Sequence, residues 1–252
     1  MIFKNLIETN LRTKVLGKTI EYYQRLDSTN EESWELINSN QAKHGMVIIT
    51  DNQLAGKGRN GNSWFMSPSK GLALSVVLTK AMPLNQAKLI PLAAGLSAAK
   101  ALENRGCNPT LKWPNDILLN GKKTGGILCE SRFSNGFVNS MIVGIGLNIN
   151  ENIYDFPESF DNKATSYAIE TGNSIQRELI CAILLTYFEQ IIEDLKSCTK
   201  EWLKFCAHKE EFVKFRMNGR GHEGIFKGIN ENGEALIKIN DEQKGFPSII
   251  IE

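Results

Sequence analysis

The segment KWPND at residues 112–116 joins a cation, an aromatic ring, a rigid turn, an amide and a carboxylate within five residues. A lysine pair at 122–123 and a glycine pair at 125–126 follow it closely. A carboxylate beside basic groups suits a magnesium–nucleotide site, in which the carboxylate holds the metal and lysine neutralises phosphate. The structural alternative is a tryptophan packed in the core beside an ordinary Pro-Asn turn.

A glycine-rich stretch upstream, GKGRNG at 56–61, matches the pattern G-x-G-x-x-G. A dinucleotide-binding fold needs a helix directly after the glycines, and the residues 62–68 that follow form a poor helix. A phosphate-binding P-loop needs a lysine where Asn62 stands, and the chain lacks the H-R-D and D-F-G motifs of protein kinases. The glycines still offer backbone N–H groups to an anion, and Lys57 and Arg59 add positive charge. The alternative is a flexible surface turn with two solvated cations.

Hydrophobic patterning predicts a main body that mixes strands and helices, which favours an α+β fold. Helices are predicted at 31–38, 85–105 and 174–196, the second of them starting or kinking at Pro91. Ser28 is predicted to begin the first helix in a capping box with Glu31. Asn148, near the end of an apolar strand, either recognises a base or a phosphate or caps a turn. Strands are predicted at 19–25, 45–51, 71–79, 110–113, 117–120, 124–131 and 137–149.

The pattern changes near the end of the chain. From Glu211 onward, short strands alternate with tight turns at Asn218-Gly219 and Asn232-Gly233. This predicts a small all-β module, so the chain divides into residues 1–207 and 208–252.

Composition restricts the class of protein. The chain has 252 residues and a net charge of +1, from 29 basic and 28 acidic side chains, which makes a broad duplex-binding surface less favoured. The N-terminus lacks the pattern of a signal peptide. Five cysteines, without a C-x-x-C pair, predict reduced structural thiols in a cytosolic protein.

Taken together and in order, several segments resemble the biotin protein ligases. With the C-terminal β module, the resemblance covers about the whole chain, and KWPND with the following lysine and glycines is a specific signal. It implies a mixed sheet with flanking helices, of the class II synthetase-like biotin/lipoate ligase type, for residues 1–207. For residues 208–252 it implies a small SH3-like β-barrel. The segments are DSTN at 27–30, Gln53, GKGRNG at 56–61, Trp64, KWPND at 112–116, Lys123, GGIL at 125–128 and GIGLN at 144–148.

The resemblance implies a two-step reaction. The biotin carboxylate attacks the α-phosphate of ATP, giving biotinyl-5′-AMP and pyrophosphate. A lysine of the biotin carboxyl carrier domain of acetyl-CoA carboxylase or a related carboxylase then attacks the acyl-adenylate. ATP with Mg²⁺ and biotin are thus the implied ligands, and no tightly bound prosthetic group is expected. No covalent enzyme intermediate is implied either, in agreement with a sequence that shows no nucleophile with an obvious base beside it.

The resemblance also implies residue roles. Ser28, Thr29 and Gln53 would hold the ureido end of biotin, and Arg59 would retain the adenylate. The catalytic set would be Arg59, Lys112, Asp116 and Lys123, with Asp116 acting either as the magnesium ligand or on the side of the acceptor lysine. The biotin set would be Ser28, Thr29, Asn30, Gln53, Gly56, Lys57, Gly58, Arg59, Trp64, Lys123, Gly125 and Gly126. The adenylate set would be Arg59, Trp113, Asn115, Lys123 and Asn148.

This chain departs from the family pattern in its glycine-rich loop. The family often has more arginines there, where Lys57, Asn60 and Asn62 stand. Lys57 keeps the charge but loses the two-pronged guanidinium, and the asparagines remove charge. Weaker phosphate binding is therefore expected.

Repressor-type members of the family carry an N-terminal winged helix-turn-helix. Too few residues precede Ser28 for a three-helix DNA reader, so no DNA partner is expected. We expect a cytoplasmic protein without a membrane partner, monomeric or homodimeric. The nearest rival is a lipoate or octanoate ligase or transferase of the same fold, and KWPND with the arginine-bearing loop favours biotin. A catalytically silent adenylate binder and an RNA-binding protein are weaker rivals.

Overall fold

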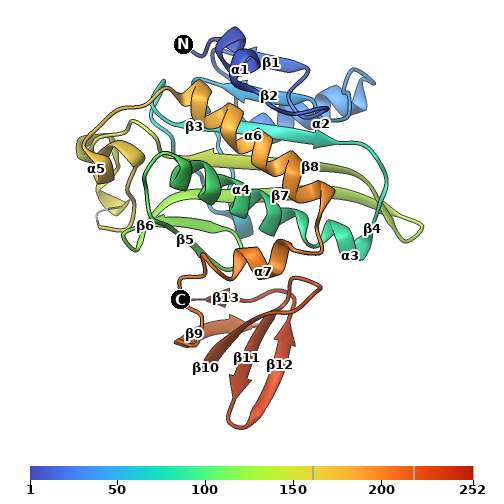
Figure 1. Cartoon of the computed structure of the whole chain (residues 1–252), viewed down its shortest axis with the longest axis vertical. Coiled ribbons are helices and arrows are strands. Elements are labelled where there is room, and N and C mark those ends of the chain that lie inside the picture. Colours follow the sequence, from blue (N-terminus) through green and yellow to red (C-terminus); the bar gives the residue numbers. More distant parts are fainter. Residues whose placement is uncertain (161, 218, 252) are drawn as a thin grey trace.

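The computed structural model describes residues 1–160, 162–217 and 219–251, and its larger part is built on one mixed sheet (Figure 1). The strands follow the order β1-β2-β3-β8-β7-β6-β5, and β4 pairs with β8 off this path. β1 and β2 are parallel, and the other neighbours are antiparallel. The bounds are β1 Ile20–Tyr23, β2 Val47–Thr50, β3 Leu72–Leu78, β4 Met82–Pro83, β5 Pro109–Lys112, β6 Asp116–Leu119, β7 Lys122–Ser134 and β8 Phe137–Leu147.

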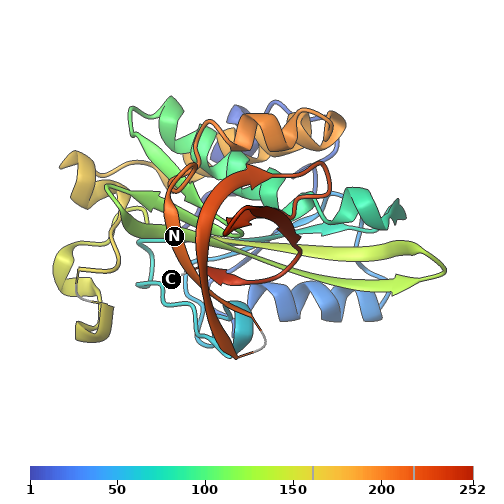
Figure 2. The ribbon, with the colours of Figure 1, turned by 90° about the horizontal axis from the view of Figure 1, so that it is seen from below.

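Helices cover both faces of this sheet (Figure 2). α4 (Ile90–Asn104) and α6 (Arg177–Glu193) pack side by side over one face, and α1 (Lys4–Asn10) packs on α6. α2 (Thr29–Asn38) covers β2, β3 and β8 from the other face. The shorter helices are α3 Leu84–Ala87, α5 Tyr167–Thr171 and α7 Cys198–Trp202, with 3-10 turns η1 Arg59–Gly61, η2 Ile153–Asp155 and η3 Glu158–Phe160.

The two covered faces explain why the central strands are apolar throughout. In β2, Val47 and Ile49 join the large core under α4 and α6. Ile48, between them, joins a smaller cluster that includes Trp34 of α2. Successive side chains of a strand point to opposite faces, so a strand covered on both sides buries every residue.

The predicted helices differ from the structure in detail. The 85–105 pattern forms two helices, and α4 has Pro91 in its first turn, which confirms a helix start there. Ser28 is the N-cap of α2, but the predicted capping box is wrong, because the Ser28 side chain makes no capping hydrogen bond. The Glu31 carboxylate forms an ion pair with Lys57 of the glycine-rich loop instead.

The C-terminal part is a five-stranded antiparallel sheet of order β12-β11-β10-β9-β13, and it curves strongly (Figure 2). Phe215 and Phe226 from this sheet belong to the same continuous core as Trp202 of α7. Asn218 of the predicted first turn lies outside the described residues, and Gly233 of the second turn has a φ of +79°. The bounds are β9 Phe212–Met217, β10 Arg220–Ile229, β11 Ala235–Ile239, β12 Glu242–Phe246 and β13 Ile250–Ile251.

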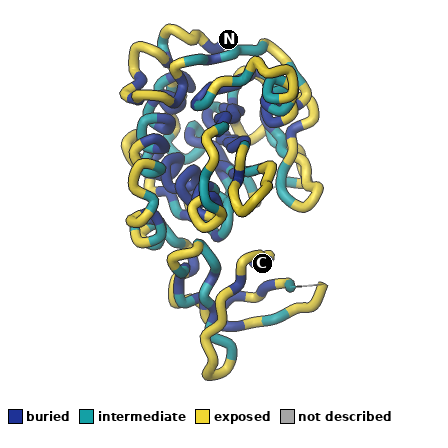
Figure 3. The backbone as a smooth tube through the Cα atoms, turned by 90° about the vertical axis from the view of Figure 1, so that its right-hand side faces the viewer, coloured by how far each residue is buried: buried dark blue, intermediate teal, exposed yellow. Residues whose placement is uncertain are grey.

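Burial is concentrated in the larger part of the molecule (Figure 3). All five cysteines are free, and Cys107, Cys181 and Cys198 are buried. In the described ranges, no helix combines the length and apolarity that crossing a bilayer requires.

Candidate functional site

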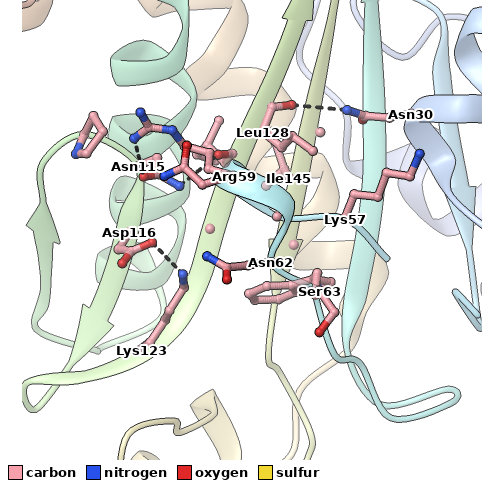
Figure 4. A pocket seen from close by; sticks show the side chains of 18 of the residues that line it. Asn30, Lys57, Arg59, Asn62, Ser63, Asn115, Asp116, Lys123, Leu128 and Ile145 are labelled. Carbon is pink, nitrogen blue, oxygen red and sulfur yellow. Dashed lines mark hydrogen bonds and ion pairs between the residues drawn. The ribbon is translucent and has the colours of Figure 1, made fainter. Parts of the chain in front are cut away.

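A pocket lies where β7 and β8 meet the start of α2 and the glycine-rich loop (Figure 4). The floor comes from the strands, and one wall comes from the β5–β6 turn that carries KWPND. The last strand of the C-terminal sheet and the residue that precedes it add residues 249–251 to the lining. Segments that are distant in the sequence therefore converge on one cavity.

One end of the pocket is lined by neutral polar side chains. Gln53 Oε1 accepts a hydrogen bond from the backbone N–H of Thr29 at 2.9 Å and lies 3.3 Å from Thr29 Oγ1. Asn30 Nδ2 donates to Glu130 Oε2 at 2.8 Å and is 3.4 Å from Leu128 O. Thr29 and Asn30 are each at least 96% buried, with 4% and 3% of their surface exposed. This end suits a small, neutral, polar group.

Two glycines of β8 leave space for side chains that reach the pocket floor. A Cβ on Gly144 would lie 2.4 Å from Asn30 Oδ1, and a Cβ on Gly146 would lie 2.4 Å from Trp64 Cε2. The two glycines share one face because they are two residues apart. Trp64 thus lies directly on the strand, and its buried Nε1 has no hydrogen-bond partner among the described residues.

The other end of the pocket is cationic. Arg59 Nη1 donates to Asn115 Oδ1 at 3.0 Å, and Asn115 Nδ2 donates to Ile127 O at 3.1 Å. Burial lowers the pKa of Arg59, and the nearby charge of Asp116 opposes that effect. Lys123 Nζ forms an ion pair with Asp116 Oδ1 at 2.6 Å. The loop arginine is therefore held against the KWPND turn, next to a lysine on β7.

The KWPND turn also contacts the C-terminal module. Trp113 is 3% exposed, and its Nε1 donates to Gly233 O at 3.1 Å. Both interpretations of this tryptophan apply, since it packs in the core and also lines the pocket. Lys112 lines the pocket too, and burial together with the Lys112 charge lowers the pKa of His208 to about 4.

Most residues of the predicted site line this one pocket. They are Ser28, Thr29, Asn30, Gln53, Lys57, Gly58, Arg59, Trp64, Lys112, Trp113, Asn115, Asp116, Lys123 and Gly126. Lys57 reaches away from the cationic end, toward Glu31 on α2, so its charge is separated from Arg59 and Lys123 (Figure 4).

Three predicted residues do not line the pocket. Gly56 is buried at the base of the loop, where its carbonyl accepts from Trp64 N at 2.8 Å. Gly125 faces the core, because a Cβ there would lie 2.4 Å from Leu147 Cδ2. Asn148 is 4% exposed, and its Nδ2 donates to Thr165 O at 3.0 Å, which favours the turn-stabilising interpretation.

Other lining residues were not predicted. Alternation in the segment 143–147 could have indicated Gly144 and Gly146, since both fall on one strand face. No sequence signal pointed to Ile249, Ile250 and Ile251, which come from the module that the pattern set apart. Asn60, Asn62 and Ser63 of the loop also line the pocket.

The comparison with known proteins identifies the family. Residues 22–148 match the model of the biotin/lipoate A/B protein ligase family. The bifunctional ligase/repressor BirA of Bacillus subtilis is 32% identical over 98% of this chain and 77% of its own length. The chain belongs to the biotin/lipoate A/B protein ligase family.

Further relatives within this ligase family share nearly the whole chain. The biotin–[acetyl-CoA-carboxylase] ligase of Mycobacterium tuberculosis is 33% identical over 93% of this chain and 90% of its own length. The biotin protein ligase of Aquifex aeolicus, solved with biotin and ATP, superposes with a TM-score of 0.79 at 27% identity, covering 93% and 98% of the two chains. The predicted α+β fold with a small C-terminal β domain is thereby confirmed.

Proposed function

We propose that this chain is a biotin–protein ligase, which activates biotin as biotinyl-5′-AMP and transfers it to a lysine of a biotin carboxyl carrier protein. The observation that carries the proposal is that one pocket has a neutral polar end at Thr29 and Gln53 and a cationic end at Arg59 and Lys123. Biotin has a neutral ureido ring at one end and a carboxylate at the other, so it matches this arrangement. The relatives named biotin ligases support the same conclusion.

In the first step, an oxygen of the biotin carboxylate attacks the α-phosphorus of ATP, and the bond to the pyrophosphate leaving group breaks. Negative charge builds up on the α-phosphate oxygens. Arg59, Lys112 and Lys123 line the pocket where this charge is expected, and fixed cations there lower the barrier. The partly buried cationic end strengthens these interactions relative to water.

In the second step, the amine of the acceptor lysine attacks the acyl carbon, and AMP leaves. Asp116 is the carboxylate in the pocket lining, and its Oδ1 pairs with Lys123. We assign Asp116 to orient the incoming amine and to accept the proton that the amine loses when the amide forms. The catalytic effect of the pocket is then positioning together with charge stabilisation.

Magnesium fits this site as a companion of ATP. No group of three or more His, Cys, Asp or Glu side chains in the described ranges could hold a metal by itself. Mg²⁺ commonly binds through phosphates, waters and one or two carboxylates, and Asp116 would be that carboxylate. The ion would neutralise phosphate charge during adenylation.

The neutral end of the pocket distinguishes biotin from lipoate and octanoate. Lipoate carries an apolar dithiolane and octanoate an alkyl chain, and neither would satisfy the buried Thr29 and the half-buried Gln53. The acceptor is proposed to be the carrier domain of acetyl-CoA carboxylase, the substrate named for the relatives. A cytoplasmic location, a monomeric or homodimeric state and the lack of a DNA partner stay predictions.

The proposal is tested with purified protein, ATP, Mg²⁺, biotin and a carrier domain. We expect pyrophosphate release and a carrier mass increase that corresponds to one biotinyl group. Calorimetry is expected to show biotin binding before ATP is added. Labelling of the carrier by lipoate or octanoate in place of biotin would overturn the assignment.

A further inference from the structure

A chain of hydrogen-bonded side chains lies behind the neutral end of the pocket. It begins at Glu130 on β7, whose Oε2 accepts from Asn30 Nδ2 at 2.8 Å. Leu128 O is 3.4 Å from the same nitrogen (Figure 4). On the other side of the amide, Asn30 Oδ1 lies 2.7 Å from Ser75 Oγ, and Ser75 Oγ lies 2.7 Å from Thr29 Oγ1. The chain therefore connects Glu130 to a threonine of the pocket lining.

The direction of each hydrogen bond follows from counting hydrogens. A carboxylate and a carbonyl only accept, so the NH₂ group of Asn30 must face Glu130 and Leu128. Asn30 Oδ1 then accepts, and the single hydrogen of the Ser75 hydroxyl must go to it. Two hydroxyl oxygens 2.7 Å apart need a hydrogen between them, so Thr29 donates to Ser75. Thr29 Oγ1 is left with only lone pairs for a ligand.

Burial and packing hold this arrangement in place. Asn30 is 3% exposed and Ser75 is fully buried. Reversing the Asn30 amide would place its oxygen against the Glu130 carboxylate, so that two acceptors would face each other without a hydrogen between them. Gly144 confines the amide from the strand side, since even a methyl group there would lie 2.4 Å from Oδ1.

Gln53 supplies the opposite hydrogen-bonding character beside Thr29. Its Oε1 accepts from the backbone N–H of Thr29 at 2.9 Å, which orients the side-chain amide. Its Nε2 has no hydrogen-bond partner in the part of the chain that the structure describes. The pocket thus presents an acceptor and a donor next to each other. A cyclic urea presents the complementary pair, an N–H group beside a carbonyl oxygen.

We propose that Glu130, Asn30 and Ser75 form a relay of positioning residues that fixes Thr29 as a hydrogen-bond acceptor and so selects a ligand N–H group. The inference rests on the proposed function, because biotin supplies the urea N–H. None of the three relay residues needs to touch the reacting atoms. They act on recognition of the ureido ring, so their substitution should change the Kd and KM for biotin and leave kcat nearly unchanged.

The relay is tested first by single substitutions at Glu130 and Ser75. Glu130→Gln has the same shape but offers an NH₂ group, so the Asn30 amide can turn its oxygen toward residue 130. The Asn30 NH₂ group then faces Ser75, and the Ser75 hydroxyl is free to donate to Thr29 instead. We expect the Kd and the KM for biotin to rise about tenfold, with kcat within about twofold of wild type. Ser75→Ala interrupts the relay and should raise both constants about fivefold.

A double variant provides the rescue. Asn30→Asp alone places two carboxylates against each other and should weaken biotin binding more than Glu130→Gln does. In Asn30→Asp with Glu130→Gln, the glutamine donates to the aspartate and the aspartate again accepts from Ser75. Biotin affinity should then return to within about threefold of wild type, a coupling that a double-mutant cycle measures.

The matched control is Ser97→Ala. Ser97 is also fully buried, but its Oγ donates to Ala94 O within α4, on the other face of the sheet. This variant should bind biotin as the wild type does. All variants are compared in calorimetry and carrier labelling, with unfolding midpoints measured in parallel.

The possible outcomes separate the relay from the proposed function. A wild-type protein that neither binds biotin nor labels the carrier overturns the proposed function and the relay with it. A wild type that binds biotin, with Glu130→Gln and Ser75→Ala binding equally well, overturns the relay alone. So does a double variant that binds no better than Glu130→Gln. Glu130 is a partly exposed position on β7, so Glu130→Gln is expected to keep the fold.

Discussion

Arg177 at the start of α6 joins the two ends of the glycine-rich loop through its hydrogen bonds to Asp51 and Gly71. Nη2 donates to Asp51 Oδ1 at 2.7 Å, and Nη1 donates to Gly71 O at 3.1 Å. Asp51 and Gly71 directly precede and follow residues 52–70, the longer segment that contains the glycine-rich loop and carries Gln53 and Arg59. The Arg177 and Asp51 side chains are only 7% and 5% exposed. A buried ion pair thus defines the base from which both ends of the pocket are built.

Arg177→Met should destabilise the protein by about 1.5–3 kcal/mol, because the buried Asp51 carboxylate loses its guanidinium partner and keeps only Tyr22, Ile2 N–H and the N-terminal amine. We also expect weaker biotin binding, since the loop ends lose their common anchor. Urea denaturation measures the first effect and calorimetry the second. Arg105→Met is the control, because Arg105 is exposed at the end of α4, and it should change stability by less than about 0.5 kcal/mol. A wild-type midpoint for Arg177→Met would contradict the prediction.

The large elements of the fold could be predicted because their patterns are strong. The strand at 71–79 and the helix at 174–196 follow from continuous apolar runs and four-residue spacing, and both appear as β3 and α6. β4 has only two residues, Met82 and Pro83, too few for any pattern. The predicted capping box is absent, because the Glu31 carboxylate pairs with Lys57, distant in the sequence, and the Ser28 side chain makes no capping hydrogen bond.

The candidate site was predicted only in part, because motifs identify residues but do not show which way their side chains point. Motif residues such as Arg59, Asn115 and Lys123 could be collected from the sequence, and the structure brings them to one pocket. The sequence did not show which face of its strand each motif residue lies on, because that depends on the register of the strands. Gly125 pairs with Leu147 and points into the core, whereas Gly126 pairs with Gly146 and points into the pocket.

Glu151 should make stability depend on pH near neutrality. It is fully buried, its Oε2 accepts from Ile149 N, and its Oε1 has no partner in the described part of the chain. Burial raises the pKa of Glu151 to about 7. The folded state therefore keeps a proton that the unfolded state releases, and this contribution to stability is present at low pH and lost as pH rises through about 7.

Glu151→Gln removes that titration. The free energy of unfolding of the wild type, relative to that of the variant, should fall by roughly 3 kcal/mol between about pH 4.5 and about pH 8. The comparison is made by urea denaturation of both proteins across this range, so that other titrating groups cancel. A difference in stability that stays constant with pH would show that Glu151 does not titrate there.

Lys123→Ala should slow adenylate formation about 100-fold while leaving the fold intact, because a fixed cation at the developing phosphate charge is removed. Exchange of labelled pyrophosphate into ATP, dependent on biotin, measures this step separately from transfer. Lys122→Ala is the neighbouring control, since Lys122 does not line the pocket. Equal exchange rates for the two variants would assign Lys123 another role.

Arg59→Gly should release the adenylate early. The arginine is held by Asn115 against the KWPND turn, so it can close the cationic end over the phosphate. Without it, we expect free biotinyl-5′-AMP to accumulate and to label bystander lysines of an added protein such as albumin. Mass spectrometry of that protein measures the loss, and a variant that labels only the carrier would refute the retention role.

Gly146→Ala should weaken biotin binding through Trp64. The added Cβ would lie 2.4 Å from Trp64 Cε2 and 2.6 Å from Nε1, so the indole must leave the strand surface and enter the pocket. We expect the KM for biotin to rise about tenfold, the order of effect that overpacking produces. Gly221→Ala is the control, because a Cβ on that strand residue meets no atom within 4 Å.

A second substitution separates a steric effect from a loss of backbone freedom at Gly146. In Gly146→Ala with Trp64→Leu, the smaller side chain leaves room for the added methyl group, so the KM should be lower than the product of the two single effects predicts. Multiplicative effects would mean that the methyl group acts independently of Trp64. In that case the contact between Gly146 and Trp64 would not be the reason that a glycine stands at this position of β8.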